Sequence, residues 1–180
     1  MKLDKKFKSL VHYVCYKCHE PSKLGKTKLN KVLYYSDFSA FYQWAKPITD
    51  EIYIKHQFGP VPSHIDGAIK ALTADGALVV RDVDHFGYTK KEFIALTKPD
   101  IKHFSGEEIS LIDEVIEIIC NGHTARSISD ASHDDVWKLA EIGEEIPYNI
   151  VFAGVLGEIT EDDVKWARKQ LNKKAGGVSV

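Results

Sequence analysis

Two cysteine–histidine groups carry the most reactive side chains of this 180-residue chain. Residues 15–19 read CYKCH, and Cys120 is followed three positions later by His123. The C-x-x-C-H spacing is that of covalent haem attachment, but Cys15 and Cys18 fall on the apolar face of a predicted helix, so we reject the haem interpretation. The two groups together could form a Cys3His zinc site, since their spacings suit a tetrahedral centre. Buried cysteines also serve as small apolar side chains, and we favour that interpretation.

Ser132, His133 and Asp134 supply the residue types of a hydrolytic triad in consecutive positions. Neighbouring side chains on a helix diverge by about 100°, so these three cannot form a Ser–His–Asp relay. His133 is better explained as a polar side chain at the junction of two helices, with Trp137 one turn further on. The chain also lacks the GxSxG, HExxH and Walker patterns. We therefore predict that it is not an enzyme and uses no cofactor.

The composition is that of an ordinary globular protein, with 44% hydrophobic and 28% charged residues. The length suits one domain, which we take to span residues 1–180 with residues 175–180 frayed. No apolar run approaches the roughly 18 residues that cross a bilayer, and the basic N-terminus leads into an amphipathic helix instead of a signal-peptide core. An odd number of cysteines without a secretory signal predicts a cytoplasmic protein with free thiols and no membrane partner.

Charge is strongly segregated along the chain, although the formal net charge is only −2. Residues 1–31 carry nine lysines against two acidic residues, whereas residues 105–163 carry fifteen acidic residues against two basic ones. Most of these charges are expected on solvated helix faces. The acidic block also creates a field that attracts basic partners and repels nucleic acid.

Apolar spacings of three and four residues predict a chain composed mainly of helices. The predicted helices cover residues 3–18, 27–44, 63–75, 105–121, 124–132 and 134–143, and a last one begins at residue 160. The second is apolar on nearly every side, as a central helix is, and we assign its Trp44 to the core. Ser63 with Asp66, and Ser105 with Glu108, are interpreted as capping boxes at helix starts.

One β-hairpin is predicted among these helices. Residues 78–83 and 88–96 are rich in β-branched and aromatic side chains and flank a turn-rich segment. Residues 51–57 form a brief extended segment, and residues 59–62 (GPVP) cannot be helical, because a residue that precedes proline leaves the α region. The predicted fold class is mainly α (α+β), a single helical domain of about six to eight helices with one inserted β-hairpin.

Three motifs stand out by their order and spacing. They are KLNKVLYYSD at residues 28–37, Gly59-Pro60-Val61, and Ser132-His133 followed by Trp137. Together they resemble the signature of the Panacea domain, the SocA-like antitoxin family that also occurs in phage-associated GepA-like proteins. The similarity extends from the first helix to about residue 150, and the three cysteines do not belong to it.

This resemblance implies an antitoxin that binds and neutralises a cognate toxin protein encoded beside it, in a bacterial or prophage toxin–antitoxin system. One branch of the family resembles a proteolytic adaptor that delivers the toxin to an AAA+ protease. Aromatic residues are enriched at binding hot spots, although such residues also pack in cores. The candidate partner-binding residues are Tyr34, Tyr35, Tyr42, Gly59, Pro60, Val61, His133 and Trp137.

A winged-helix DNA-binding regulator is the alternative, because helices followed by a hairpin also form such a unit. Its recognition helix would be residues 63–75, which offer only His64 and Lys70 as contacts to phosphates or bases. DNA-reading helices usually carry several Arg, Asn or Gln residues. Arg81 and the lysines at 90–91 on the hairpin favour the alternative, but we rank toxin binding first and do not expect nucleic acid as the partner.

Overall fold

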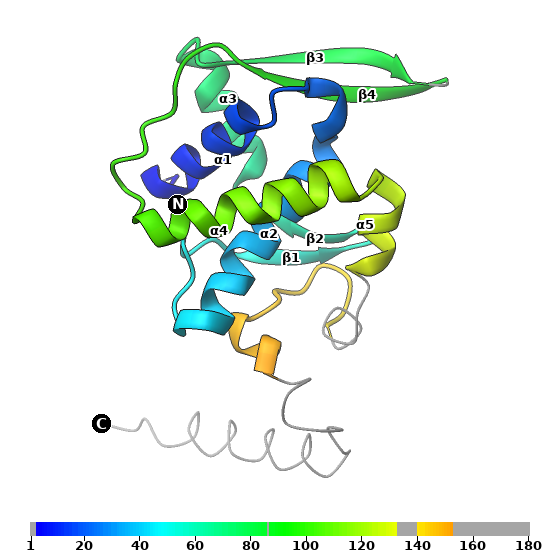
Figure 1. Cartoon of the computed structure of the whole chain (residues 1–180). Coiled ribbons are helices and arrows are strands. Elements are labelled where there is room, and N and C mark those ends of the chain that lie inside the picture. Colours follow the sequence, from blue (N-terminus) through cyan, green and yellow to red (C-terminus); the bar gives the residue numbers. More distant parts are fainter. Residues whose placement is uncertain (1–2, 86, 133–139, 153–180) are drawn as a thin grey trace, which may run out of the picture.

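The chain folds as helices packed around one long central helix, together with two β-hairpins (Figure 1). The computed structural model describes residues 3–85, 87–132 and 140–152. The α-helices are α1 (Lys5–Lys17), α2 (Pro21–Trp44), α3 (Ile65–Ala74), α4 (Gly106–Ile116) and α5 (Ala125–Ala131). The strands are β1 (Tyr53–His56), β2 (Gly59–Pro62), β3 (Leu78–His85) and β4 (Tyr88–Ala95), and two short turns are the π-helical η1 (Glu117–Asn121) and the 3-10 helical η2 (Tyr148–Phe152).

The mainly helical α+β class is therefore confirmed, with two differences of detail. Within the described residues there are five α-helices, fewer than the predicted six to eight, and two hairpins where one was expected. The helices predicted over residues 134–143 and from residue 160 fall largely or wholly outside the described residues. Among the described residues, no helix combines the length and apolarity that a bilayer crossing requires.

Helix α2 is central, as its apolar surface predicted. It contacts α1, α4, α5, η1, η2, β2 and β4. It begins at Pro21, but the non-helical backbone of Gly25 (φ 62°, ψ 163°) interrupts it with a kink, so its long continuous part starts close to the predicted residue 27. The core assignment of Trp44 was wrong: this side chain is 40% exposed, since the last turn of α2 extends beyond the elements that cover the helix.

The unpredicted hairpin pairs β1 with β2 in antiparallel register, from Tyr53 opposite Pro62 to His56 opposite Gly59. Residues 143–146 extend this layer on the other side of β1, where the Ile146 N–H donates to the Tyr53 carbonyl at 2.8 Å. The predicted extended segment over residues 51–57 is thus correct. The GPVP segment was correctly predicted to be non-helical, but it is a strand and not merely a turn.

Two of the predicted helix starts are confirmed and one is wrong. Ser105 and Glu108 form the predicted capping box, and Thr124 caps α5. Ser63 does not cap α3, because its hydroxyl donates to the Glu51 carboxylate at 2.9 Å. The same carboxylate accepts the backbone N–H of His64, the N-cap residue, at 2.9 Å. A side chain from the preceding segment therefore does the work that was assigned to the local box.

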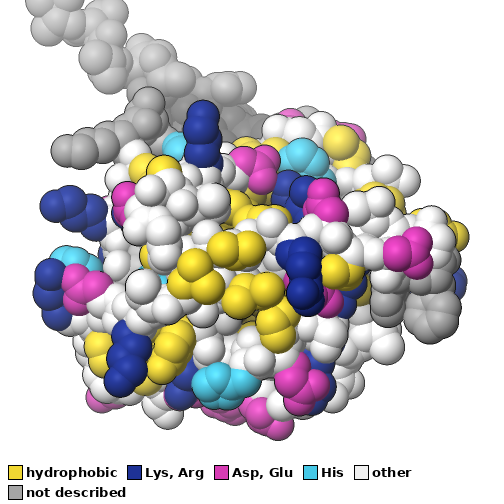
Figure 2. Space-filling view, turned by 90° about the horizontal axis from the view of Figure 1, so that it is seen from above, with side chains coloured by type: hydrophobic (Ala, Val, Ile, Leu, Met, Phe, Trp, Pro, Cys, Tyr) yellow, Lys and Arg dark blue, Asp and Glu magenta, His cyan; other side chains and the backbone are white. Residues whose placement is uncertain are grey.

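The second hairpin, β3–β4, confirms the predicted one, with Leu78 opposite Ala95 and His85 opposite Tyr88. It lies across the top of the molecule in Figure 1, with α3 beneath its first end. Viewed from above, in Figure 2, apolar side chains group at the centre of the surface and charged side chains surround them. Val79 and Leu96 are 41% and 57% exposed.

The segregated charges meet where α1 packs on α4. The Lys6 ammonium lies 2.7 Å from the Glu108 carboxylate, and that of Lys17 lies 2.9 Å from Asp113. Asp113 also accepts the hydroxyl of Tyr13 at 2.7 Å. Part of the basic N-terminal segment therefore neutralises part of the acidic block within the fold, which leaves fewer acidic groups for a partner than the sequence suggested.

Candidate partner-binding site

The motif KLNKVLYYSD lies on α2, where five of its polar side chains are buried, and three of these five contact three different segments. Lys28 Nζ donates to the carbonyl of Cys120 at 3.0 Å and so holds η1. Asp37 accepts the N–H and the hydroxyl of Thr49, both at 2.6 Å, and the hydroxyl of Tyr53 at 2.8 Å. Burial of the Asp37 carboxyl raises its pKa to about 7, although these three donors act in the opposite direction.

The third side chain, Lys31, lies against the backbone of Gly59 in β2. Gly59 has φ of +100°, and a Cβ built on it would lie 1.7 Å from Lys31 Nζ and 2.6 Å from the Ser132 hydroxyl. Only glycine accommodates this approach together with this backbone angle. The pair of Lys31 and Gly59 thereby fixes the GPVP strand against α2. Ser132, from the motif that ends at Trp137, contacts Gly59 at the same place.

A pocket opens beside this contact, between α2, the β1–β2 hairpin and the start of α3. Its volume is about 520 Å³. We call it the turn pocket, and its lining includes Thr27, Asn30, Ile54, Phe58, Val61 and Ile65. The lining is more apolar than polar, and the pocket has the size at which proteins bind small molecules or a protruding side chain.

Phe58, in the turn between the two strands, is 67% exposed and lines the turn pocket. A largely exposed phenyl ring at the rim of a pocket is typical of a recognition surface, because it contributes apolar area when a partner covers it. Sequence reasoning missed this residue. The available signal was an aromatic side chain placed directly before the Gly-Pro turn, where no core face claims it.

Asn30 adds a polar group to the lining. Its side chain is 7% exposed, and within the described part of the chain Oδ1 has no hydrogen-bond donor. An unsatisfied buried amide oxygen is unfavourable by roughly 1–3 kcal/mol. A donor supplied by a bound partner would remove that penalty after a small side-chain rotation. Asn30 is therefore one of several polar groups in the lining, which also includes Lys26, Lys31, His56, Ser63 and Asp66.

The outer edge of β2 limits how a partner can dock. Ser63 N–H donates to the Ile52 carbonyl at 2.8 Å, so alternate residues of the hairpin direct their backbone groups toward β1. Pro60 and Pro62 fall on the other alternation and face away from β1. Proline has no N–H, so this edge offers carbonyl acceptors alone and cannot pair with an added strand. A partner that binds here must therefore dock by inserting side chains into the turn pocket.

The aromatic candidates lie at a second, shallower hollow of about 300 Å³, which we call the aromatic groove. Tyr35 is half-buried in it and Tyr42 is 54% exposed. Tyr34 lines the groove but is only 4% exposed, and its ring packs on Phe38 with centroids 4.2 Å apart. The question left open for Tyr34 and Tyr35 thus has different answers: Tyr34 belongs to the core, and Tyr35 lies at its margin.

The remaining candidates divide in the same way. Gly59 and Pro60 are buried in β2, and Val61 is half-buried in the lining of the turn pocket. His133 and Trp137 lie outside the described residues. The structure thus brings the turn residues to one pocket and Tyr35 and Tyr42 to another.

The three cysteines are buried and unbridged. The Cys18 thiol donates to the carbonyl of Glu20 at 3.7 Å and interacts with the Cys120 thiol, whereas His123 lies near the Ser127 hydroxyl at 3.2 Å. Among residues 3–85, 87–132 and 140–152, no group of three His, Cys, Asp or Glu side chains is placed to hold a metal ion. The zinc alternative therefore gains no support from the arrangement of its four residues.

Of the three residues of the sequence triad, only Ser132 lies among the described residues. The Ser132 hydroxyl donates to the carbonyl of Ser129 at 2.8 Å and lies beside Gly59. Its role is to close the end of α5 against β2.

Comparison with known families matches residues 29–138 to the family described as antitoxin SocA-like, Panacea domain. The match covers more than half of the chain, and the chain belongs to this family. The matched range, residues 29–138, includes most of the residues that line the turn pocket and the aromatic groove. No curated protein and no solved structure matches the chain.

Proposed function

We propose that this member of the SocA-like antitoxin family binds a cognate toxin protein at the turn pocket and thereby neutralises it without catalysis. Family membership supports an antitoxin role in general. The observation that carries the choice of surface is the exposed Phe58 ring at the rim of an apolar pocket built from the GPVP strand. In this proposal Gly59, Pro60 and Val61 shape the pocket.

The contacts favour a toxin that inserts an apolar side chain flanked by a hydrogen-bond donor. Ile54, Val61 and Ile65 supply apolar walls, and Asn30 supplies the acceptor. Hot spots of this kind are small, well packed and rimmed by groups that exclude water, a role that Phe58 can fill. The proline-blocked edge of β2 excludes strand addition, so affinity has to come from side chains.

The aromatic groove is the second surface of the proposal. Tyr42 is the aromatic side chain it exposes most, and Tyr35 forms its floor beside the buried Tyr34. A toxin large enough to bury a standard interface of about 800 Å² on each partner can reach beyond a single pocket. We therefore include Tyr35 and Tyr42 as contacts, and Tyr34 as their support.

The test begins with the open reading frames that flank the gene. Each is induced in a bacterial host alone and together with this chain, and survivors are counted. A neighbour that kills alone and is tolerated in company supports the proposal and provides the partner. If neither neighbour is toxic, the proposal that this chain neutralises a toxin encoded beside it is contradicted.

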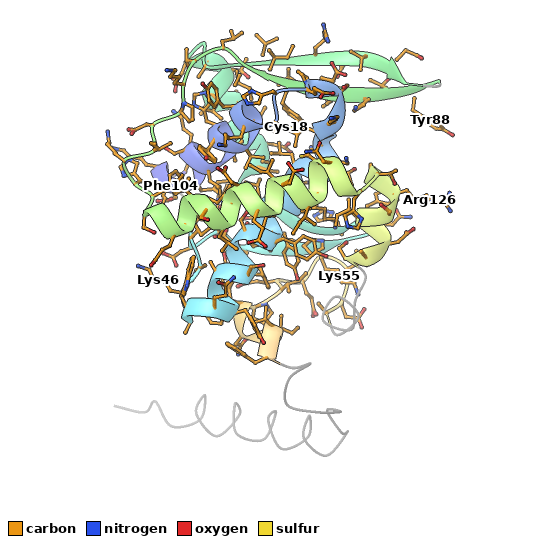
Figure 3. The ribbon with its side chains drawn as sticks, in the orientation of Figure 1. Cys18, Lys46, Lys55, Tyr88, Phe104 and Arg126 are labelled. Carbon is orange, nitrogen blue, oxygen red and sulfur yellow. The ribbon has the colours of Figure 1, made fainter. Side chains whose placement is uncertain are left out.

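The surface is then tested with matched aromatic variants. Phe58→Ala should weaken toxin binding at least tenfold and restore killing. Tyr88→Ala is the control, because Tyr88 is 76% exposed at the tip of the other hairpin, away from the turn pocket (Figure 3). Equal binding by both variants would show that the toxin docks elsewhere, while the antitoxin role itself would stand.

Delivery of the toxin to an AAA+ protease is a finer form of the same proposal. It predicts that co-expression lowers the abundance of the toxin in a host that contains the protease and not in a protease-deficient host. Neutralisation without a change in toxin abundance would support inhibition by binding alone.

A further inference from the structure

A second pocket lies on a different part of the molecule from the turn pocket, between the first turns of α1, the end of α3 and the loop that joins β4 to α4. Its volume is about 490 Å³. Figure 1 shows this loop passing the N-terminal end of α1 on its way to α4. We call it the basic pocket, because four lysines line it against two aspartates: Lys5, Lys8, Lys98 and Lys102 with Asp75 and Asp100.

The lysines of α1 separate into two groups with different tasks. Lys6 and Lys17 pair with acidic residues of α4, as described above. Lys5 and Lys8 line the basic pocket instead. The lysines of α1 are therefore not all free on the surface. Some form ion pairs that hold α1 against α4, and others line a concave site.

Two of the four lysines in the pocket form ion pairs with its two aspartates, and the other two do not. Lys8 lies 2.5 Å from Asp75, and Lys102 lies 2.6 Å from Asp100. Within the described part of the chain, neither Lys5 nor Lys98 has an ion-pair partner. The pocket thus keeps a net positive charge, and the low-dielectric protein around it concentrates the electric field more than a flat surface would.

The loop that supplies Lys98 is anchored to the body of the protein. His12, buried on α1, donates from Nε2 to the carbonyl of Thr97 at 2.9 Å. The N–H of Leu96 donates to the carbonyl of Ala77 at 2.9 Å. These two bonds fix the backbone of residues 96 and 97, which leads directly into Lys98, against α1 and the residue before β3.

We propose that the basic pocket binds a small phosphate-bearing ligand of nucleotide size. Ammonium groups from α1 and from the loop would bind phosphate oxygens, with the Ser9 hydroxyl and the His103 imidazole as further donors. Asp75 and Asp100 are acceptors for hydroxyl or amino groups on the same ligand, and they make the pocket less suited to a uniformly charged polyanion.

The experiment titrates the full chain with pyrophosphate, with ATP and with a short DNA duplex, each at low and at moderate salt, by calorimetry and fluorescence anisotropy. We expect saturable binding of ATP and pyrophosphate. The double variant Lys5→Ala/Lys98→Ala should weaken it at least tenfold. The control Lys46→Ala/Lys70→Ala removes the same charge from exposed positions that do not line the pocket, and Lys46 is separated from α1 by α4 in Figure 3.

The outcomes separate the sources of phosphate. Duplex binding that is tighter than ATP binding, and that only the Lys5/Lys98 variant loses, would assign the site to a nucleic-acid backbone. No binding of any probe at low salt, or equal weakening by both double variants, would overturn the site. Circular dichroism of each variant verifies that the fold is intact. None of these readouts involves a toxin, so the result is independent of the proposed antitoxin function.

Discussion

The Lys31 side chain occupies the space that a Cβ on Gly59 would need, 1.7 Å from its position. This contact joins the second turn of the KLNKVLYYSD motif to the GPVP strand and explains why the two motifs belong together. Lys31 is 1% exposed, so its stem is packed and cannot swing into solvent. The position of β2, and with it the shape of the turn pocket, depends on this pair.

Gly59→Ala should lower the free energy of unfolding by about 3 kcal/mol, because the new methyl group collides with Lys31 and the backbone keeps a φ angle that alanine disfavours. Urea unfolding monitored by tryptophan fluorescence measures the loss. Gly67→Ala is the matched control: Gly67 lies in α3 with nothing within 4 Å of a built Cβ, and this variant should gain about 0.5–1 kcal/mol. Equal destabilisation by both variants would show that the contact between Lys31 and Gly59 does not cause the loss of stability.

The buried Asp37 carboxyl should make the stability of the protein depend on pH. Burial raises its pKa from 3.8 to about 7, so between these values the folded state holds a proton that the unfolded state releases. The contribution of Asp37 is therefore fully present below about pH 4 and falls as the pH rises toward 7, by up to roughly 1.4 kcal/mol per pH unit. Urea unfolding at pH 5 and at pH 7.5 should show this decline.

Asp37→Asn provides the comparison, since its amide does not titrate. The gap in unfolding free energy between wild type and Asp37→Asn should narrow at pH 7.5 relative to pH 5. Asp130→Asn, which removes an exposed carboxylate from α5, should retain the decline seen in wild type. A gap that stays constant between pH 5 and pH 7.5 would mean that Asp37 is ionised in the folded protein throughout.

The local features of this fold were predictable from sequence, and the contacts between distant segments were not. The Ser105–Glu108 box was found because both partners lie within one helical turn. The Ser63–Asp66 box failed because Glu51, twelve positions before Ser63, takes its hydroxyl. Lys28 and Lys31 were not expected in the core, since helical periodicity places lysine in solvent unless a partner from elsewhere in the chain satisfies it.

The candidate site shows the same division. The Gly59-Pro60-Val61 segment was identified from its types and from the family resemblance, and it does border a pocket. Phe58 and Asn30 were missed, because the pocket needs α2, the hairpin and α3 at once. Basic residues from α1 and the β4–α4 loop likewise converge only in three dimensions.

The three thiols should react with an alkylating or disulfide reagent in a defined order. Burial raises the pKa of the Cys15 thiol, and the hydrogen bond to Cys18 together with burial raises that of Cys120. The pKa of Cys18 is lowered, chiefly because the Cys120 thiol donates to it and secondarily by the Lys28 and Lys23 charges. Thiolate is the reactive form, so Cys18 should be labelled first in the native protein.

Mass spectrometry of partially labelled native protein identifies the site. Lys28→Met should slow the labelling of Cys18, since it removes a nearby positive charge, whereas Lys23→Met should have a smaller effect because Lys23 is a weaker contributor. Unfolded protein should label all three cysteines at similar rates. Preferential labelling of Cys15 in the native state would contradict the order.

The acidic residues of α4 should divide into a structural and a steering group. Asp113 holds Lys17 and Tyr13, so Asp113→Asn should lower the free energy of unfolding by about 1 kcal/mol. Glu107 and Glu114 are exposed, and no ion pair involves them within the described residues. Glu107→Gln/Glu114→Gln should therefore leave the stability unchanged, which thermal unfolding can establish.

If a basic toxin is guided by this surface, the same double variant should slow association severalfold at low salt and lose that effect at high salt, because exposed charges are screened beyond about 10 Å at 0.1 M ionic strength. Stopped-flow association with the toxin, compared with that of Asp113→Asn, distinguishes the two groups. An association rate that does not change with the double variant at any salt concentration would show that the acidic block serves only to pack α1 and to solvate the surface.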